Sequence, residues 1–414
     1  MLARRDGGGL FPTILAGVIA AITGFASSFA LVIAGLGAVG ATDGQASSGL
    51  FALCLATGIT CIVLPLAMRI PISFAWSTPG AALLIAAGAV TGEFAAAVGA
   101  FLVCGVLIVL AGLWPALGRA ITSIPKPIAS AMLAGILFPI CLAPVTASVT
   151  EPAIAIPMVL VWLVLARLAP RWAVPAAMLV AVIGIGIAAG PDVFASASAA
   201  PHLEFVLPVF DPLVIVSLGL PLFIVTMAGQ NVPGFAVMST FGYSPAPRPV
   251  LVSSGLGTVG AAVFGGHAIN LAAITAALMA SPESNPDRSK RWIATFTSGV
   301  VYLALGLCAG LATAVVAAAP PIIITAVAGL ALLGALVTAI TGALDSPQHR
   351  ITGAATFLVT ASGISIVGIG SAFWGLVVGG VLMAWLSPWK RHSASAVSVH
   401  ARPEEEIDDE PDRP

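Results

Sequence analysis

Two short polar motifs interrupt a sequence that is otherwise rich in apolar residues. The first is FAWSTPGAALL, residues 74–84, and the second is FGGHAINLAAI, residues 264–274. In the first motif Ser77 or Thr78 suits a helix cap, and Pro79 at the first helical position has no N–H to lose. Backbone N–H groups at a helix N-terminus can hydrogen-bond an anion. The first motif therefore predicts extended backbone followed by a short helix whose start suits an anion.

The second motif has the same character. Gly265 and Gly266 permit an extended approach, and we expect a short helix to begin near Ala268. The segment GAALLIAAGA from Gly80 also resembles NLAAITAALM from Asn270. Matched interrupted helices in two halves of a chain are typical of a transporter's substrate site. We expect the two helix starts to face each other across a central cavity and to point at one spot. Two simple helix kinks are the alternative.

The elements that carry these motifs must be membrane-spanning helices. Hydrophobic residues make up 59% of the 414 residues and charged residues 8%, whereas soluble domains carry about 25% charged residues. At roughly 20 apolar residues per span, the polar breaks predict about 14 segments. With both termini cytoplasmic, all 16 basic residues then fall on one side of the membrane. Each half would hold seven segments, an odd number, so the expected fold is an all-α 7+7 inverted repeat.

The longest polar breaks divide the chain into regions. The break at 191–212 separates two similar halves, and the C-terminal run EEEIDDEPDRP has too little apolar content to fold. We expect a cytoplasmic N-terminus (1–10), a first inverted repeat (11–190), an external linker (191–212), a second inverted repeat (213–388) and a disordered acidic cytoplasmic tail (389–414).

Further candidate ligands lie in other apolar stretches. Gln230 and Asn231 are neighbouring amides that can donate to a carboxylate, while Phe25 and Trp76 suit an apolar wall for a flat ring. Helix packing is the alternative role for each of them. The predicted substrate-binding residues are Phe25, Ser27, Ser28, Trp76, Ser77, Thr78, Gly80, Gln230, Asn231, Gly265, Gly266, His267 and Asn270.

His267 is the one histidine expected near the middle of a span. Imidazole changes its charge near physiological pH, and an ionisable group inside a membrane usually has a function. An incoming carboxylate would favour the protonated ring, whereas burial and a helix N-terminus would oppose it. The sequence therefore predicts proton coupling at His267. The alternative is a neutral His267, with protons carried by waters or by Asp345 or Asp287.

Three long motifs in order resemble those of the bacterial benzoate/proton symporter (BenE) family. They are PISFAWSTPGAALL, VTMAGQNVPGFAV (225–237) and FGGHAINLAAITAAL, and the resemblance extends to about Pro388. It implies a multi-pass protein of the bacterial inner membrane that imports benzoate with protons by alternating access. It also implies relatedness to nucleobase symporters and to bicarbonate and sulfate carriers. In these folds the first four segments of each half form a core that moves against a gate. The resemblance does not decide whether the chain forms a homodimer.

The absence of acidic residues in the spans favours an anionic substrate. The related nucleobase carriers have carboxylates in the eighth and tenth segments, where this chain has Gln230, Asn231 and Asn270. A carboxylate there would repel benzoate. The expected ligands are thus benzoate or a related aromatic carboxylate, protons and membrane lipid, with no cofactor, metal or nucleic acid. A nucleobase or other small-solute symporter, or an anion exchanger, is the alternative, and an enzyme is not expected because no nucleophile–base pair is evident.

Overall fold

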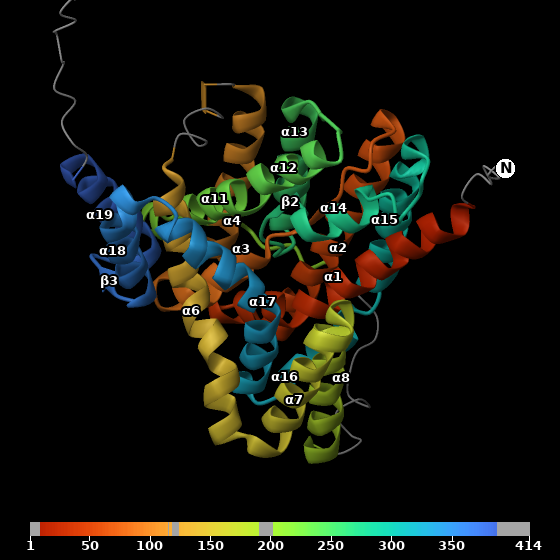
Figure 1. Ribbon diagram of the computed structural model, residues 1–414. Helices are drawn as coiled ribbons and strands as arrows, with labels where there is room; N and C mark the ends of the chain where they lie inside the picture. Colours follow the sequence, from red (N-terminus) through yellow and green to blue (C-terminus); the bar gives the residue numbers. More distant parts are fainter. Residues whose placement is uncertain (1–8, 115, 118–123, 190–201, 387–414) are drawn as a thin grey trace, which may run out of the picture.

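The computed structural model describes residues 9–114, 116–117, 124–189 and 202–386 (Figure 1). The predicted tail at 389–414 lies outside them, as do 1–8 and part of the predicted linker. The first half contains α1 (Leu10–Ala38), α2 (Asp43–Met68), β1 (Phe74–Trp76), α3 (Thr78–Thr91), α4 (Phe94–Leu113), α6 (Lys126–Thr150), α7 (Pro152–Leu168) and α8 (Pro170–Ala189).

The second half begins with one continuous helical rod made of five short pieces. These are α10 (Pro212–Val214), the π-helical turn η1 (Ile215–Gly219), α11 (Leu220–Thr226), the π-helical turn η2 (Met227–Asn231) and α12 (Val232–Thr240). There follow α13 (Pro247–Ala262), β2 (Ile269–Leu271), α14 (Ala273–Ala280), η3 (Arg288–Lys290), α15 (Trp292–Gly306), α16 (Ala309–Ala317), α17 (Pro321–Leu344), η4 (Pro347–His349), α18 (Arg350–Ala361), β3 (Ser365–Ile366), β4 (Ile369–Gly370) and α19 (Ser371–Leu386).

Six of the described helical stretches are long and apolar enough to cross a membrane by themselves. They are α1, α2, α4, α6, the rod from α10 to α12, and α17. The pair α15 and α16, bent by 58° at a short break, would make a seventh span. Four shorter apolar helices lie among them: α3, α7, α8 and α19. The count of fourteen segments and their inverted repeat stay predictions.

The two interrupted motifs meet in a two-stranded antiparallel ribbon. β1 pairs with β2 in the register Phe74 with Leu271, Ala75 with Asn270, and Trp76 with Ile269. The prediction that the second helix begins near Ala268 is wrong, because the chain stays extended through this pairing and α14 begins at Ala273. The proposed match of Gly80 with Asn270 fails for the same reason, since Asn270 lies in the strand.

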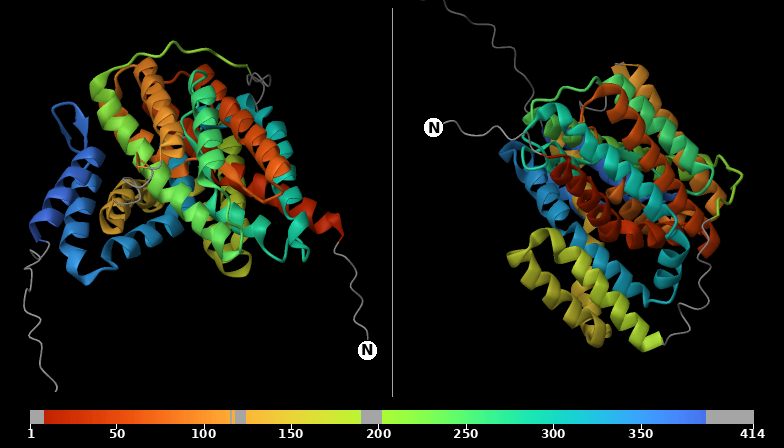
Figure 2. Two further views of the ribbon diagram at one scale, coloured as in Figure 1. Left: turned by 90° about the horizontal axis from the view of Figure 1, so that it is seen from above. Right: turned by 90° about the vertical axis from the view of Figure 1, so that its right-hand side faces the viewer.

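The helices form two groups (Figure 2). In the first bundle, α13 packs on α4, α15 packs on α2, and α1 packs on α15 and α3; the rod from α10 to α12, α14 and α16 also belong to it. In the second bundle, α17 packs on α6, α7 packs on α8, and α18 packs on α6 and α19. The bundles touch where α1 meets α17 and α8, and where α3 meets α6. The ribbon lies inside the first bundle.

Glycines allow α2 and α15 to pack closely beside the ribbon. A Cβ at Gly299 would lie 2.7 Å from the Gly58 carbonyl oxygen, and a Cβ at Gly58 would lie 2.9 Å from the Gly299 carbonyl oxygen. Small residues at a crossing point are a common way for membrane helices to approach each other. This contact fixes the part of α15 that presents Tyr302 to the ribbon.

Candidate substrate site

The helix that follows β1 is capped by a side chain. The backbone N–H of Gly80 donates to the Ser77 hydroxyl at 3.1 Å, and the Thr226 hydroxyl donates to the same oxygen at 3.1 Å. Of the two caps that the sequence allowed, the structure uses Ser77, and α3 begins at Thr78 with Pro79 in its first turn. The rod that carries Thr226 therefore holds the start of α3.

The helix that follows β2 has no side-chain cap. Ala272 occupies its N-cap position, so the first N–H groups of α14 lack an intrahelical acceptor. Two hydroxyls lie beside them, since Ser73 Oγ and Thr275 Oγ1 are 3.4 Å apart. This end of α14 combines free backbone donors with hydroxyl groups, which suits an anion.

The two helix starts lie at opposite ends of the ribbon, and that they point at one spot stays a prediction. The Ser77 N–H donates to the Ala268 carbonyl at one end of the ribbon, and the Ala272 N–H donates to the Ser73 carbonyl at the other end. Ser77 and Ala272 are thus four residues apart along the ribbon, roughly 13 Å at the usual rise per residue. The paired strands occupy the space between the helix starts.

The amides of the rod have different surroundings. Asn231 is fully buried, and its Oδ1 accepts from the Leu271 N–H at 2.9 Å while its Nδ2 contacts Met227 Sδ at 3.2 Å. Gln230, its neighbour in the π-helical turn η2, is only half-buried. Such turns often mark functional sites in helices. Asn231 holds β2 in place, which leaves Gln230 as the amide available for a ligand.

Aromatic side chains gather where β1 meets α1 and α15. The ring centroids of Phe25 and Trp76 are 5.8 Å apart, and those of Trp76 and Tyr302 are 5.6 Å apart, both edge to face. The indole N–H of Trp76 donates to the Ser28 hydroxyl at 2.9 Å. The hydroxyls of Ser27 and Ser28 both donate to the Gly24 carbonyl of their own helix. Phe25, Ser28 and Trp76 are therefore brought together.

Gly24 brings this aromatic group close to α14. A Cβ at Gly24 would lie 2.5 Å from the Tyr302 hydroxyl and 3.9 Å from the Thr275 methyl group. Thr275, in the first turn of α14, and the Tyr302 hydroxyl therefore lie beside the same residue of α1. This arrangement offers hydrogen-bond donors and an apolar wall to one small ligand.

The remaining predicted residues lie around the turn between α13 and β2. Gly265 has a φ of +87°, and Gly266 is packed against Ala261, so these two glycines build the turn rather than the start of α14. The Asn270 amide, oriented with its oxygen toward Ser77, accepts from the Ser77 N–H at 3.3 Å. His267 is fully buried, and both its ring nitrogens lack a hydrogen-bond partner among the described residues.

Comparison with known proteins decides the family. The family described as "Benzoate membrane transport protein" matches residues 10–385. The chain belongs to this benzoate transporter family. "Inner membrane protein YdcO" of Escherichia coli (strain K12) is 42% identical over 373 residues, which cover 89% of this chain and 94% of that protein. "Benzoate membrane transport protein" of Acinetobacter baylyi is 32% identical over 337 residues, which cover 80% and 84% respectively.

Solved anion-transporter structures share the fold of this family member. The transmembrane domain of the cyanobacterium bicarbonate transporter BicA matches with a TM-score of 0.55 at 17% identity, over 89% of this chain and 98% of that chain. The murine Slc26a9 anion transporter, in the inward-facing state, matches with a TM-score of 0.56 at 15% identity, over 93% and 69%. The protein is thus a multi-pass membrane transporter and not an enzyme.

Two further residues, which the sequence motifs did not indicate, join the candidate site. Thr226 and Tyr302 contact Ser77 and Trp76 from segments distant in the sequence. Tyr302 lies in none of the three quoted motifs, whereas Thr226 is the second residue of VTMAGQNVPGFAV, four residues before Gln230 in the same helical rod. A polar residue one helical turn from a candidate amide was the signal that could have found Thr226.

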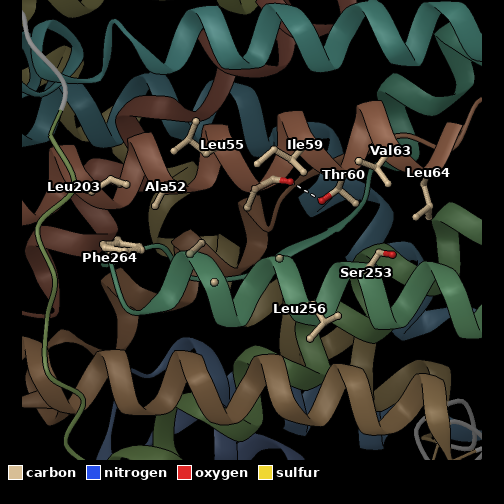
Figure 3. A pocket seen from close by; sticks show the side chains of 14 residues that line it. Ala52, Leu55, Ile59, Thr60, Val63, Leu64, Leu203, Ser253, Leu256 and Phe264 are labelled. Atoms are coloured by element: carbon tan, nitrogen blue, oxygen red, sulfur yellow. Dashed lines mark hydrogen bonds between the residues drawn. The ribbon is translucent and has the colours of Figure 1, made fainter. Parts of the chain in front are cut away.

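A large groove elsewhere on this transporter is less suited to an anion. It has a volume of about 440 Å³ and lies between α2 and α13 (Figure 3). Its flanks are apolar and exposed at Ile59, Val63 and Leu256, and the Thr60 hydroxyl is already bonded to Ala56. The groove therefore suits hydrocarbon, and the start of α14 is the better candidate for a carboxylate.

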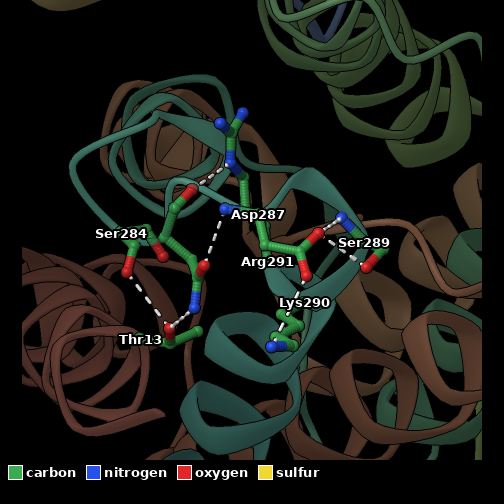
Figure 4. Close-up of polar contacts among 7 residues, drawn as sticks. Thr13, Ser284, Asp287, Ser289, Lys290 and Arg291 are labelled. Atoms are coloured by element: carbon green, nitrogen blue, oxygen red, sulfur yellow. Dashed lines mark hydrogen bonds and ion pairs between the residues drawn. The ribbon is translucent and has the colours of Figure 1, made fainter. Parts of the chain in front are cut away.

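The far end of α14 is held by a buried arginine, whose contact with the Asn285 carbonyl is drawn in Figure 4. Arg291 is 6% exposed; its Nη1 donates to the Ala280 carbonyl at 2.8 Å and its Nε donates to the Asn285 carbonyl at 2.7 Å. The Asn285 side chain in turn donates to the Thr13 hydroxyl of α1 at 2.8 Å. A cation at the C-terminal end of a helix is favourable, so this network anchors α14 to α1 and α15.

Proposed function

We propose that this transporter moves benzoate or a similar aromatic carboxylate across the membrane together with protons. The uncapped start of α14 beside the aromatic group of Phe25, Trp76 and Tyr302 carries the proposal. The carboxylate would accept from the first N–H groups of α14 and from the hydroxyls of Ser73 and Thr275. The ring would pack against the aromatic side chains. The positive end of a helix and a set of neutral donors favour an anion without a competing charge.

The proposed proton carrier is His267. Its buried imidazole lacks a hydrogen-bond partner among the described residues, so an anion that passes the Ser77 end of the ribbon would stabilise the protonated ring. Asp287 suits the role less, because the hydroxyl and the backbone N–H of Ser289 hold the pKa of its carboxyl below the usual range. Asp345 is two-thirds exposed and paired with Lys126. Because His267 precedes Ala268 at the Ser77 end of the ribbon, proton uptake there would accompany passage of the anion along the ribbon rather than its binding at the start of α14.

We further propose the architecture that the sequence predicts. Fourteen segments would form two inverted repeats, 11–190 and 213–388, with both termini on the cytoplasmic side of a bacterial inner membrane. The first bundle, which contains the ribbon, would move as a core against the second bundle as a gate. Residues 202–211 support an external linker tied to the core, because the Val206 N–H donates to the Val263 carbonyl and the Val209 N–H donates to the Ala95 carbonyl.

Anion exchange is the second candidate function. Two of the solved structures of similar fold are named as bicarbonate and anion transporters, and an exchanger needs no proton carrier. A nucleobase is disfavoured because the buried polar residues at the ribbon and rod, Ser77, Asn231 and Asn270, include no carboxylate. The coupling ion therefore distinguishes the two leading candidates.

The deciding experiment uses purified protein in proteoliposomes with acid outside. We expect wild-type protein to accumulate benzoate above equilibrium and to ignore uracil and bicarbonate. His267→Gln should still exchange labelled for unlabelled benzoate but should reach only equal concentrations on the two sides. His202→Gln, at an exposed position, is the matched control and should accumulate normally. Wild-type accumulation by His267→Gln would remove the histidine from the proposal, and exchange without pH dependence would favour an anion exchanger.

A further inference from the structure

A second cavity lies between the two bundles at the start of α6. It has a volume of about 230 Å³, below the roughly 300–1,000 Å³ that drug-sized ligands occupy. Lys126, Ser130 and Leu133 line it from α6, and Ala228, Gly229 and Val232 line it from the rod. The rod residues flank Gln230 in the sequence. The cavity therefore joins the second bundle to the helix that holds both halves of the ribbon.

The ammonium group of Lys126, which lines this cavity, is held by an exposed ion pair. Lys126 Nζ lies 3.2 Å from Asp345 Oδ2 at the end of α17, and the two side chains are 70% and 66% exposed. An exposed ion pair of this kind contributes little to stability. Lys126 is also the first residue of α6, where the positive end of the helix dipole adds to its charge. A second anion can therefore compete with Asp345 for the ammonium group.

We propose that this cavity is a second binding station for an aromatic carboxylate, on the path between the start of α14 and the membrane face on which Lys126 lies. The ammonium group of Lys126 binds the carboxylate in place of Asp345, the Ser130 hydroxyl donates to it, and Leu133 and Val232 contact the ring. The station rests on the proposed function, since it needs a carboxylate that passes between the bundles. It selects for negative charge before the central site is reached.

The test compares benzoate with benzamide, which has the same ring and no charge. In proteoliposomes, half-saturating concentrations are measured separately for flux that starts from each membrane face. For flux that starts from the Lys126 face, Lys126→Gln should raise the half-saturating benzoate concentration by roughly 2- to 5-fold, the size of an exposed charge contact. Lys126→Arg should stay near wild type, and Asp345→Asn should lower the value because it frees Lys126. Inhibition by benzamide should not change.

Ionic strength provides an independent measurement. The difference between wild type and Lys126→Gln should shrink as salt rises, because exposed charges are screened. Three results would overturn the station while leaving benzoate transport intact. They are equal changes in the half-saturating concentration for benzoate and benzamide, equal changes for flux from both faces, or no change in Lys126→Gln and Asp345→Asn. Wild-type protein that neither binds nor moves benzoate would overturn the proposed function and the station together.

Discussion

The helices α3 and α14 both leave the same ribbon, but they are secured at opposite ends. The start of α3 is held by the Ser77 hydroxyl, which Thr226 supports. The start of α14 carries only Ala272, and its C-terminal end is held by Arg291. A helix fastened at its far end can keep its N-terminal donors free without losing its position. The difference leaves the N-terminal donors of α14 without a side-chain cap, whereas the start of α3 is capped by Ser77.

The largest effect on stability is expected at Arg291, which holds the C-terminal end of α14. Arg291→Gln removes two charge-assisted hydrogen bonds and leaves the Ala280 and Asn285 carbonyls without their donor, which should lower the free energy of unfolding by about 3 kcal/mol. The stability of Arg291→Lys should lie between those of wild type and Arg291→Gln, because lysine keeps the charge but lacks the planar guanidinium group. Chemical denaturation in detergent measures both variants. A Gln variant as stable as wild type would show that α14 is not held at this end.

The next largest effects are expected at Asn231 and Gln230, the two amide residues of the rod, and they should differ in kind. Asn231→Ala leaves the buried Leu271 N–H without an acceptor and should cost about 1–3 kcal/mol of unfolding free energy. Gln230→Ala should cost little stability and should weaken benzoate binding instead. Denaturation and equilibrium binding, measured on both variants, test this division of roles. If Gln230→Ala bound benzoate with wild-type affinity, the predicted ligand role of Gln230 would be wrong.

The smallest effects are expected from two substitutions that exchange the capping of the helices, one that adds a side-chain cap to α14 and one that removes the cap of α3. Ala272→Ser supplies a hydroxyl to the free N–H groups of α14 and should weaken benzoate binding about 10-fold, the loss of roughly one hydrogen bond. Ser77→Ala should instead destabilise the protein by about 1 kcal/mol through loss of the cap. Calorimetric titration with benzoate and denaturation measure the pair. Unchanged affinity in Ala272→Ser would place the carboxylate elsewhere.

Local residue preferences account for what the sequence predicted correctly. Long apolar runs indicated helices, and the Ser-Thr-Pro-Gly order at 77–80 indicated both the break and the cap of α3. The start of α14 was misplaced by five residues, because Ile269 to Leu271 are kept extended by pairing with a strand almost two hundred residues away. The opposed placement of the helix starts, the role of Arg291 and the contact of Tyr302 with Trp76 also depend on such distant pairings, which no single motif encodes.

The three residue pairs of the ribbon have a consequence for how this stretch can change during evolution. Successive residues of a strand point to opposite faces, so one residue added or deleted between Pro71 and Ser77 would turn Trp76 away from Ser28 and Tyr302. Replacing a side chain leaves that alternation intact. We expect homologous chains to differ here by substitution and to keep the number of residues between α2 and α3 constant, whereas the loop between α17 and α18 can vary in length.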